Sequence, residues 1–190
     1  MSDEPSTTSR DKILKAATGI AQAHGYGGLN LRTLAEQVGI KAASLYYHFP
    51  SKADLAAAVA QRYAEDSAAT LAALATDAGD PAACLLRYPE TFRRSLANSN
   101  RICLCSFMAA EYDDLPAAVQ DAVQVFADQN VAWLETVLQA AGALPEQAQR
   151  RARAIFAAVS GAQLMARGKA DIALFDDLIG TYRALGLLAP

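Results

Sequence analysis

Apolar residues recur along most of the chain with the spacing of amphipathic helices. The segment 31–38 is one example, because its apolar residues fall at i, i+3, i+4 and i+7 on a single helical face: Leu31, Leu34, Ala35 and Val38. No stretch shows the sustained alternation of a strand, and the abundant Ala, Leu, Gln and Arg favour helices. We therefore expect an all-α fold with about nine helices. Their approximate ranges are 9–24, 31–38, 41–49, 52–76, 82–97, 102–112, 117–141 and 145–169, with a last helix starting at Asp171 or Asp176.

Two of these helices and the turn between them have the form of a helix-turn-helix. Asn30 can cap the helix 31–38, because its side-chain carbonyl can accept a backbone N–H of the first turn. Gly39 follows where a left-handed residue commonly ends a helix. In the next helix, Leu45 and Phe49 are expected to pack inward. A short turn containing glycine between two helices is typical of this DNA-binding unit.

The opposite side of the second helix carries small residues followed by aromatic ones. Ala43, Ser44 and Tyr47 share that side, and Tyr46 lies on its flank. Small residues let a helix sit deep in a DNA groove, and tyrosines offer a ring and a hydroxyl to bases and phosphates. In the alternative interpretation, Tyr46, Tyr47 and His48 simply cover the core of a small three-helix unit.

A longer stretch carries a family resemblance. Ala-Ala-Ser-Leu-Tyr-Tyr-His-Phe-Pro-Ser-Lys, residues 42–52, resembles the hallmark of the TetR family of transcriptional regulators, as does Leu-Arg-Thr-Leu-Ala-Glu-Gln-Val-Gly-Ile before it. The resemblance covers roughly residues 9–63. It implies contact with double-stranded operator DNA through nine positions: Arg32, Lys41, Ala42, Ala43, Ser44, Tyr46, Tyr47, His48 and Lys52. Lys52 also begins a helix that Ser51 can cap, which suits a bound phosphate.

The resemblance further implies a second, all-helical domain that holds a ligand pocket and forms a homodimer. We divide the chain into a disordered tail (1–8), a helix-turn-helix DNA-binding domain (9–56) and a ligand-binding and dimerisation domain (57–190). Ala42 and Ala43 have no hydrogen-bonding side chain. We therefore expect contact with thymine methyl groups, or recognition of DNA shape, to matter at these two positions.

The net charge of −3 is unevenly divided along the chain. Residues 9–56 hold six basic and three acidic side chains, whereas residues 57–190 hold eleven basic and fifteen acidic ones. The basic surplus therefore lies in the DNA-reading part, as expected if only that end meets phosphate. Because the surplus is modest, non-specific DNA binding should be weak and sensitive to salt.

Other features of the composition favour a cytoplasmic protein that does not enter the membrane. No run of eighteen apolar residues occurs, and the first residues lack the apolar segment of a signal peptide. The three cysteines are an odd number without the spacing of a disulfide framework, which suits a reducing compartment.

Several large side chains of the second domain are candidates to line a pocket for an unknown small-molecule effector. Such pockets are mostly apolar with a few polar groups. The candidates are Tyr63, Tyr88, Phe92, Cys103, Phe107, Phe126 and Trp133. In the alternative interpretation, these side chains fill the core, as aromatic residues at helical spacing usually do.

Cys103 carries a second hypothesis, that of a thiol-based sensor of electrophiles or oxidants. The nearby Arg101 could lower the thiol pKa and so raise its reactivity. The stretch also resembles that of TetR-family members that sense such compounds through a cysteine. The alternative is an inert core thiol, because cysteine is among the most buried residue types.

Catalysis and metal binding find little support in the sequence. The two histidines, His24 and His48, have no neighbouring cluster of ligands, and the second domain has no histidine that could activate a nucleophile. We expect neither an enzyme nor a cofactor. The acidic residues Glu111, Asp113 and Asp114 are interpreted as a solvated helix end.

Apolar residues of the last two helices form the predicted homodimer interface. A dimer would place two recognition helices about one turn of DNA apart. The predicted interface residues are Phe156, Val159, Gly161, Leu164, Phe175, Leu178, Ile179 and Tyr182. Gly161 in mid-helix would allow close approach. In the alternative interpretation, these residues pack only within one chain.

The sequence thus predicts a repressor that binds palindromic operator DNA as a dimer and is released by a small-molecule effector. Two alternatives remain open: a thiol-based sensing repressor acting through Cys103, and a constitutive DNA-binding factor without an effector.

Overall fold

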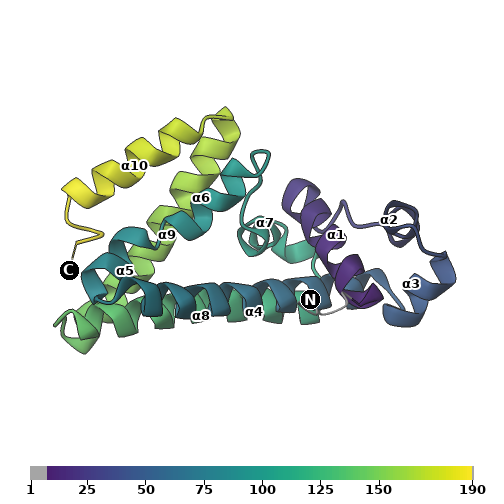
Figure 1. The fold of residues 1–190 in the computed structure, drawn as a ribbon, viewed down its shortest axis with the longest axis horizontal. Coiled ribbons are helices and arrows are strands. Elements are labelled where there is room, and N and C mark those ends of the chain that lie inside the picture. Colours follow the sequence, from purple (N-terminus) through teal and green to yellow (C-terminus); the bar gives the residue numbers. More distant parts are fainter. Residues whose placement is uncertain (1–7, 190) are drawn as a thin grey trace, which may run out of the picture.

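The computed structural model describes residues 8–189, which form an all-α fold without strands in that range (Figure 1). The expected disordered tail, apart from Thr8, lies outside the described residues. The helices are α1 (Ser9–His24), α2 (Leu31–Val38), α3 (Ala42–His48), α4 (Lys52–Ala78), α5 (Pro81–Arg87), α6 (Glu90–Ala97), α7 (Leu104–Ala110), the 3₁₀ helix η1 (Tyr112–Asp114), α8 (Ala117–Ala140), α9 (Pro145–Lys169) and α10 (Ile172–Ala184). The predicted fold class is confirmed.

Helices α1, α2 and α3 form a small unit at one end of the molecule, which we call the head (Figure 1). The predicted cap of α2 is present, since Asn30 Oδ1 accepts the backbone N–H groups of Arg32 and Thr33 at 3.0 and 3.1 Å. Gly39 ends the helix in the left-handed conformation at φ +76°, which favours glycine. Local capping chemistry thus fixes both ends of α2.

The 27-residue helix α4 connects the head to the rest of the molecule. Its first turn is capped by Ser51, whose Oγ accepts the backbone N–H of Asp54 at 3.1 Å. Buried residues near its start, such as Leu55 and Val59, pack with the head, and Leu71 farther along belongs to the core of the second domain. One rigid helix therefore spans both parts.

The predicted single helix over 82–97 is wrong, because the structure divides it into α5 and α6. Pro89 lies at the break. Proline has no backbone N–H and its ring clashes with the carbonyl four residues earlier, so it ends a helix or starts a new one. The described part of the chain therefore has ten α-helices.

One further helix differs from its predicted range, and the start of the last helix is now decided. Helix α7 covers Leu104–Ala110 rather than 102–112, and the short η1 follows it. Of the two predicted starts for the last helix, the structure has the first: Asp171 caps α10 by accepting the backbone N–H of Ala173 at 2.9 Å.

Helices α4 and α8 lie side by side along the length of the molecule, α9 packs against α8, and α10 packs against α9 (Figure 1). The core between these helices is aromatic in part. Tyr88 stacks on Trp133 with ring centroids 5.8 Å apart, and its hydroxyl donates to Asn130 Oδ1 at 3.0 Å. None of the described helices combines the length and apolar character needed to cross a membrane.

Candidate functional site

Helix α3 presents the predicted DNA-facing residues on the outside of the head. Tyr47 is 86% exposed and Tyr46 is 50% exposed, whereas Leu45 and Phe49 are buried. The two tyrosines therefore do not cover the core, contrary to the alternative interpretation. The remaining exposed candidates are Arg32, Lys41, Ala42, Ala43 and Ser44. One continuous face of small, basic and aromatic residues is thus open to a duplex.

The last two candidates, His48 and Lys52, are half-buried. The imidazole of His48 meets the ring of Tyr47 edge-on, with centroids 5.5 Å apart. Lys52 Nζ lies 4.3 Å from the ring centroid of Tyr26 and donates to the carbonyl oxygen of Gly27 at 3.3 Å. Lys52 therefore supports the turn after α1, and its remaining ammonium donors are the ones available to a phosphate.

Four side chains from outside the head bind helix α1 or the turn after it. Glu111 accepts the backbone N–H groups of Tyr26 at 2.7 Å and Gly27 at 3.5 Å. Arg101 donates to the carbonyl oxygen of Gly19, and Arg167 donates to that of Ala23 at 3.1 Å. On the other side, Arg62 of α4 pairs with Asp11 at 3.3 Å. The head is thus held by specific polar contacts as well as by packing.

The sequence interpretation predicted none of these four contacts, and it gave two of the residues another role. Glu111 is not part of a solvated acidic end, and Arg101 points to α1 rather than to the thiol of Cys103. No local pattern could reveal either contact, because the partners are 85 and 82 residues apart in the chain.

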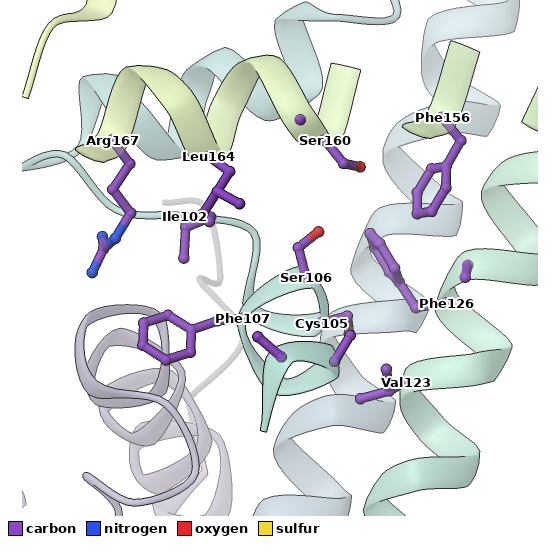
Figure 2. Close-up of a pocket in the computed structure, with 14 residues that line it drawn as sticks. Ile102, Cys105, Ser106, Phe107, Val123, Phe126, Phe156, Ser160, Leu164 and Arg167 are labelled. Atoms are coloured by element: carbon purple, nitrogen blue, oxygen red, sulfur yellow. The ribbon is translucent and has the colours of Figure 1, made fainter. Parts of the chain in front are cut away.

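An apolar cavity of about 600 Å³ lies between α7, α8 and α9 (Figure 2). This volume is in the range of small-molecule sites. Its lining residues are Ile102, Cys105, Ser106, Phe107, Ala109, Ala110, Val123, Phe126, Ala127, Phe156, Ser160, Gly161, Leu164 and Arg167. The structure therefore places two of the seven predicted pocket residues, Phe107 and Phe126, on this cavity.

The other predicted pocket residues lie elsewhere. Tyr63, Phe92 and Cys103 border a void of only about 30 Å³, too small for an effector. Tyr88 and Trp133 pack against each other in the core and border no described cavity. Which aromatic residues face a cavity depends on how the helices cross, and the spacing within one helix does not determine that.

The surroundings of Cys103 are those of a core thiol. Cys103 is buried, and burial raises the pKa of its thiol. Cys105, which borders the cavity, is also buried, and burial raises the pKa of that thiol well above its ordinary value. A reactive thiol needs a lowered pKa and access to solvent, and neither sulfur has both.

Three of the predicted dimer residues pack within the chain. Val159, Phe175 and Ile179 are buried in the isolated chain, so a partner cannot cover them. Leu178 and Tyr182 are half-buried against the same core. Leu178 and Tyr182 each keep part of their surface exposed, so their place in a dimer interface stays a prediction.

The remaining predicted dimer residues, Phe156, Gly161 and Leu164, line the cavity. Leu164 is also 62% exposed, and its neighbour Met165 is 56% exposed. Gly161, one turn earlier on the same helix, is exposed as well. Large apolar side chains beside small residues on an open helix face are typical of a surface that another protein covers.

Among the described residues, no group of three or more histidine, cysteine, aspartate or glutamate side chains is arranged to hold a metal ion. The buried polar groups serve the fold instead. Gln163, for example, accepts the backbone N–H of Cys103 at 2.9 Å and donates to the carbonyl oxygen of Phe92 at 2.6 Å.

Curated proteins match this chain over a short stretch. The HTH-type transcriptional regulator LmrA of Bacillus subtilis (strain 168) is 50% identical over 42 residues, which are 22% of either chain. IcaR of Staphylococcus aureus (strain Newman), named as a negative transcriptional regulator of a biofilm operon, is 49% identical over 43 residues, 23% of either chain. The match thus spans less than a quarter of these curated relatives.

Solved structures match over nearly the whole chain. A TetR transcriptional regulator from Legionella pneumophila is 25% identical, with a TM-score of 0.90 over 96% of this chain and 99% of that one. A TetR-family regulator from Agrobacterium tumefaciens is 30% identical, with a TM-score of 0.83 over 90% of this chain and 94% of that one.

Family models match both parts of the molecule. Residues 13–59 match the model described as bacterial regulatory proteins, tetR family, and residues 81–179 match the C-terminal domain described as transcriptional regulator LmrA/YxaF-like. The second match alone spans more than half of the chain. The exposed face of α3 and the helical domain behind it therefore have one common explanation: the chain belongs to the TetR family of transcriptional regulators.

Proposed function

We propose that the protein is a repressor that binds palindromic operator DNA as a homodimer and leaves the DNA when a small molecule occupies the second domain. The observation that carries the proposal is the exposed face of α3, where Tyr46 and Tyr47 project from an otherwise well-packed head. Exposed aromatic side chains on one short helix, preceded by the exposed Lys41, fit readout in the major groove.

The homodimer follows from the size of the reading surface. A single recognition helix reads a few base pairs, and two-fold dimers place two such helices one turn of DNA apart. The exposed face of α9 with Gly161, Leu164 and Met165 supports this assembly, because it offers apolar area and close approach.

Release by an effector is supported by the cavity of about 600 Å³ and by its position beside α1 (Figure 2). A ligand shifts the protein between two states only if it binds one of them better. Arg167 both lines the cavity and bonds the end of α1, so a ligand in the cavity can disturb this contact, and DNA affinity would change with it.

The pocket hypothesis has more support than the two alternatives. The burial of Cys103 and the raised pKa of its thiol weigh against the thiol sensor. A cavity of ligand size weighs against a constitutive factor, because one of its lining residues, Arg167, bonds the end of α1. Binding to operator DNA also agrees with a cytoplasmic location.

The test is fluorescence anisotropy of the purified protein with labelled DNA from the upstream region of its own gene and from genomic fragments selected by the protein. We expect tight, salt-sensitive binding to a palindromic fragment and weak binding to a scrambled one. Sedimentation should show two protein chains for each palindrome. Selected fragments that share no palindrome, or a single chain on each fragment, would contradict the proposal.

A further inference from the structure

The large cavity has a sparse and uneven polar lining. Of its fourteen lining residues, Arg167 is the only charged one, and the hydroxyls of Ser106 and Ser160 are the other polar side-chain groups apart from the thiol of Cys105. Figure 2 shows Arg167 near one end of the cavity, beside Phe107, and the two serines farther along it. The cavity thus suits a molecule with an apolar body and polar groups at separate places.

The guanidinium of Arg167 donates hydrogen bonds to neutral carbonyl groups but pairs with no carboxylate among the described residues. It donates to the backbone carbonyl oxygens of Asn100 at 2.6 Å and Ala23 at 3.1 Å, and it lies 5.5 Å from the ring centroid of Phe107. None of the ion pairs formed by the described residues includes it. Neutral acceptors replace only part of the hydration that a charged guanidinium loses when it is half-buried. A carboxylate would match the N–H donors of the guanidinium in both charge and shape.

Ser160 supplies a second and independent indication of a ligand. Its Oγ is buried and has no hydrogen-bond partner in the described structure, which is unusual for a buried hydroxyl. Ser160 and Arg167 are seven residues apart on α9, so they share one face about 10 Å apart along the axis. Figure 2 shows the hydroxyls of Ser106 and Ser160 close to the same open space.

We propose that this cavity binds an elongated apolar carboxylate, that its carboxylate pairs with Arg167, and that a hydroxyl or carbonyl farther along the molecule bonds Ser160. The proposal rests on the ligand-released repressor described above and names the chemical class of its effector. The apolar body would lie against Phe107, Val123 and Phe126.

The same pairing couples the cavity to the head. Arg167 now donates to the carbonyl oxygen of Ala23, in the last turn of α1. A carboxylate is a stronger acceptor than a neutral carbonyl, so a ligand that takes these donors leaves the end of α1 without one of its contacts. Arg101 and Glu111 still bind α1 and the following turn, so the head is loosened rather than detached.

The test is calorimetric titration of the full-length protein without DNA, using three probes: decanoate, 10-hydroxydecanoate and 1-decanol. We expect both carboxylates to bind and the Arg167→Gln variant to weaken them about tenfold or more, as for loss of a charge-assisted hydrogen bond. Binding of 1-decanol should not change in that variant. Ser160→Ala should weaken 10-hydroxydecanoate and leave decanoate unchanged.

Arg101→Gln is the matched control, because Arg101 also donates to a carbonyl of α1 but does not line the cavity. It should bind all three probes as the unmodified protein does. The proposal is overturned if no carboxylate binds, if decanoate binds no better than 1-decanol, or if Arg167→Gln binds decanoate unchanged. The comparison of decanoate with 1-decanol needs no variant, so it holds even if Arg167→Gln folds poorly.

Amide hydrogen exchange tests the coupling without DNA. Decanoate should speed exchange in residues 21–28 of the unmodified protein, whereas 1-decanol should not; equal exchange with both probes would overturn this step. Anisotropy with operator DNA is then a separate measurement. If carboxylates bind through Arg167 but no DNA is bound specifically, the repressor proposal is refuted and the ligand assignment stands. If operator DNA is bound but no carboxylate binds, the ligand assignment is refuted and the repressor proposal stands.

Discussion

The carboxylate of Glu111 accepts the backbone N–H of Tyr26 at 2.7 Å, across 85 residues of sequence. This bond joins the end of α7 to the turn that follows α1. The turn approaches the carboxylate so closely that a Cβ atom on Gly25 would lie 2.3 Å from Glu111 Oε2, and Gly25 has φ +65°. The backbone conformation therefore favours glycine there, and a larger residue would also have to displace the Glu111 carboxylate from its present position.

Replacing Glu111 with alanine should lower the free energy of unfolding by about 1–2 kcal/mol, because two backbone N–H groups lose a charged acceptor. Urea unfolding followed by circular dichroism measures the change. Asp113→Ala is the matched control, since Asp113 is exposed in the adjoining η1. Equal effects of the two substitutions would mean that the contact at Tyr26 contributes nothing to stability.

Replacing Tyr47 with alanine should weaken binding to operator DNA about tenfold or more while leaving the stability of the fold nearly unchanged. The ring is 86% exposed, so its removal costs the free protein little. A side chain that touches base edges or phosphates contributes about 1–3 kcal/mol to binding. Anisotropy gives the affinity and thermal melting gives the stability. Tyr112→Ala, an exposed tyrosine far from α3 in the chain, should retain full DNA affinity.

Gln163 should be essential for the junction between α7 and α9. Replacing it with leucine leaves the buried backbone N–H of Cys103 without its acceptor, at a cost of about 1–3 kcal/mol. The same substitution at Gln149, which is exposed on the same helix, should have almost no effect. The urea unfolding midpoint should be lower for Gln163→Leu than for Gln149→Leu. Similar midpoints would show that another group accepts the backbone N–H of Cys103.

The buried thiols should make the fold sensitive to alkaline pH. Burial raises the pKa of Cys84, Cys103 and Cys105 in the folded chain, so the unfolded chain releases these protons first. Their contribution to stability is therefore complete at neutral pH and is lost as the pH rises past the ordinary thiol value of about 8.5. Urea unfolding at a series of pH values should show a falling midpoint in that direction.

The same burial predicts slow alkylation of the thiols. Iodoacetamide should label the native protein far more slowly than the urea-unfolded protein, because native thiols are neutral and covered. Mass spectrometry of the labelled peptides identifies the cysteine. Rapid labelling of Cys103 in the native state would restore the thiol-sensor hypothesis.

The features that the sequence predicted correctly are governed by local chemistry. The cap at Asn30 and the left-handed glycine at Gly39 involve residues within a few positions of each other, so they are visible in the sequence. The amphipathic pattern likewise identified Leu45 and Phe49 as the buried side of α3. The break at Pro89, which the expected single helix 82–97 overlooked, was local too, and the proline itself was the signal that could have revealed it.

The features that the sequence did not predict depend on how helices far apart in the chain meet. Trp133 and Phe107 are both aromatic residues in helical segments, yet only Phe107 borders the cavity. Arg167 gave no signal, because its partners are backbone carbonyls of Asn100 and Ala23. Every residue has a backbone carbonyl, so residue types do not reveal which one an arginine will bind. Such contacts become visible only in the folded structure.

Those main-chain partners have a consequence for how the protein can change over evolutionary time. Arg101, Arg167 and Glu111 bind carbonyl and N–H groups of the head, which every residue type other than proline offers in full. The exposed side chains of α3, which take no part in these bonds, are therefore free to diverge toward a new operator without altering this attachment. If the head is replaced by that of a relative with the same backbone, the chimera should still respond to the original effector. The operator sequence that is recognised and the effector that is bound can therefore evolve independently.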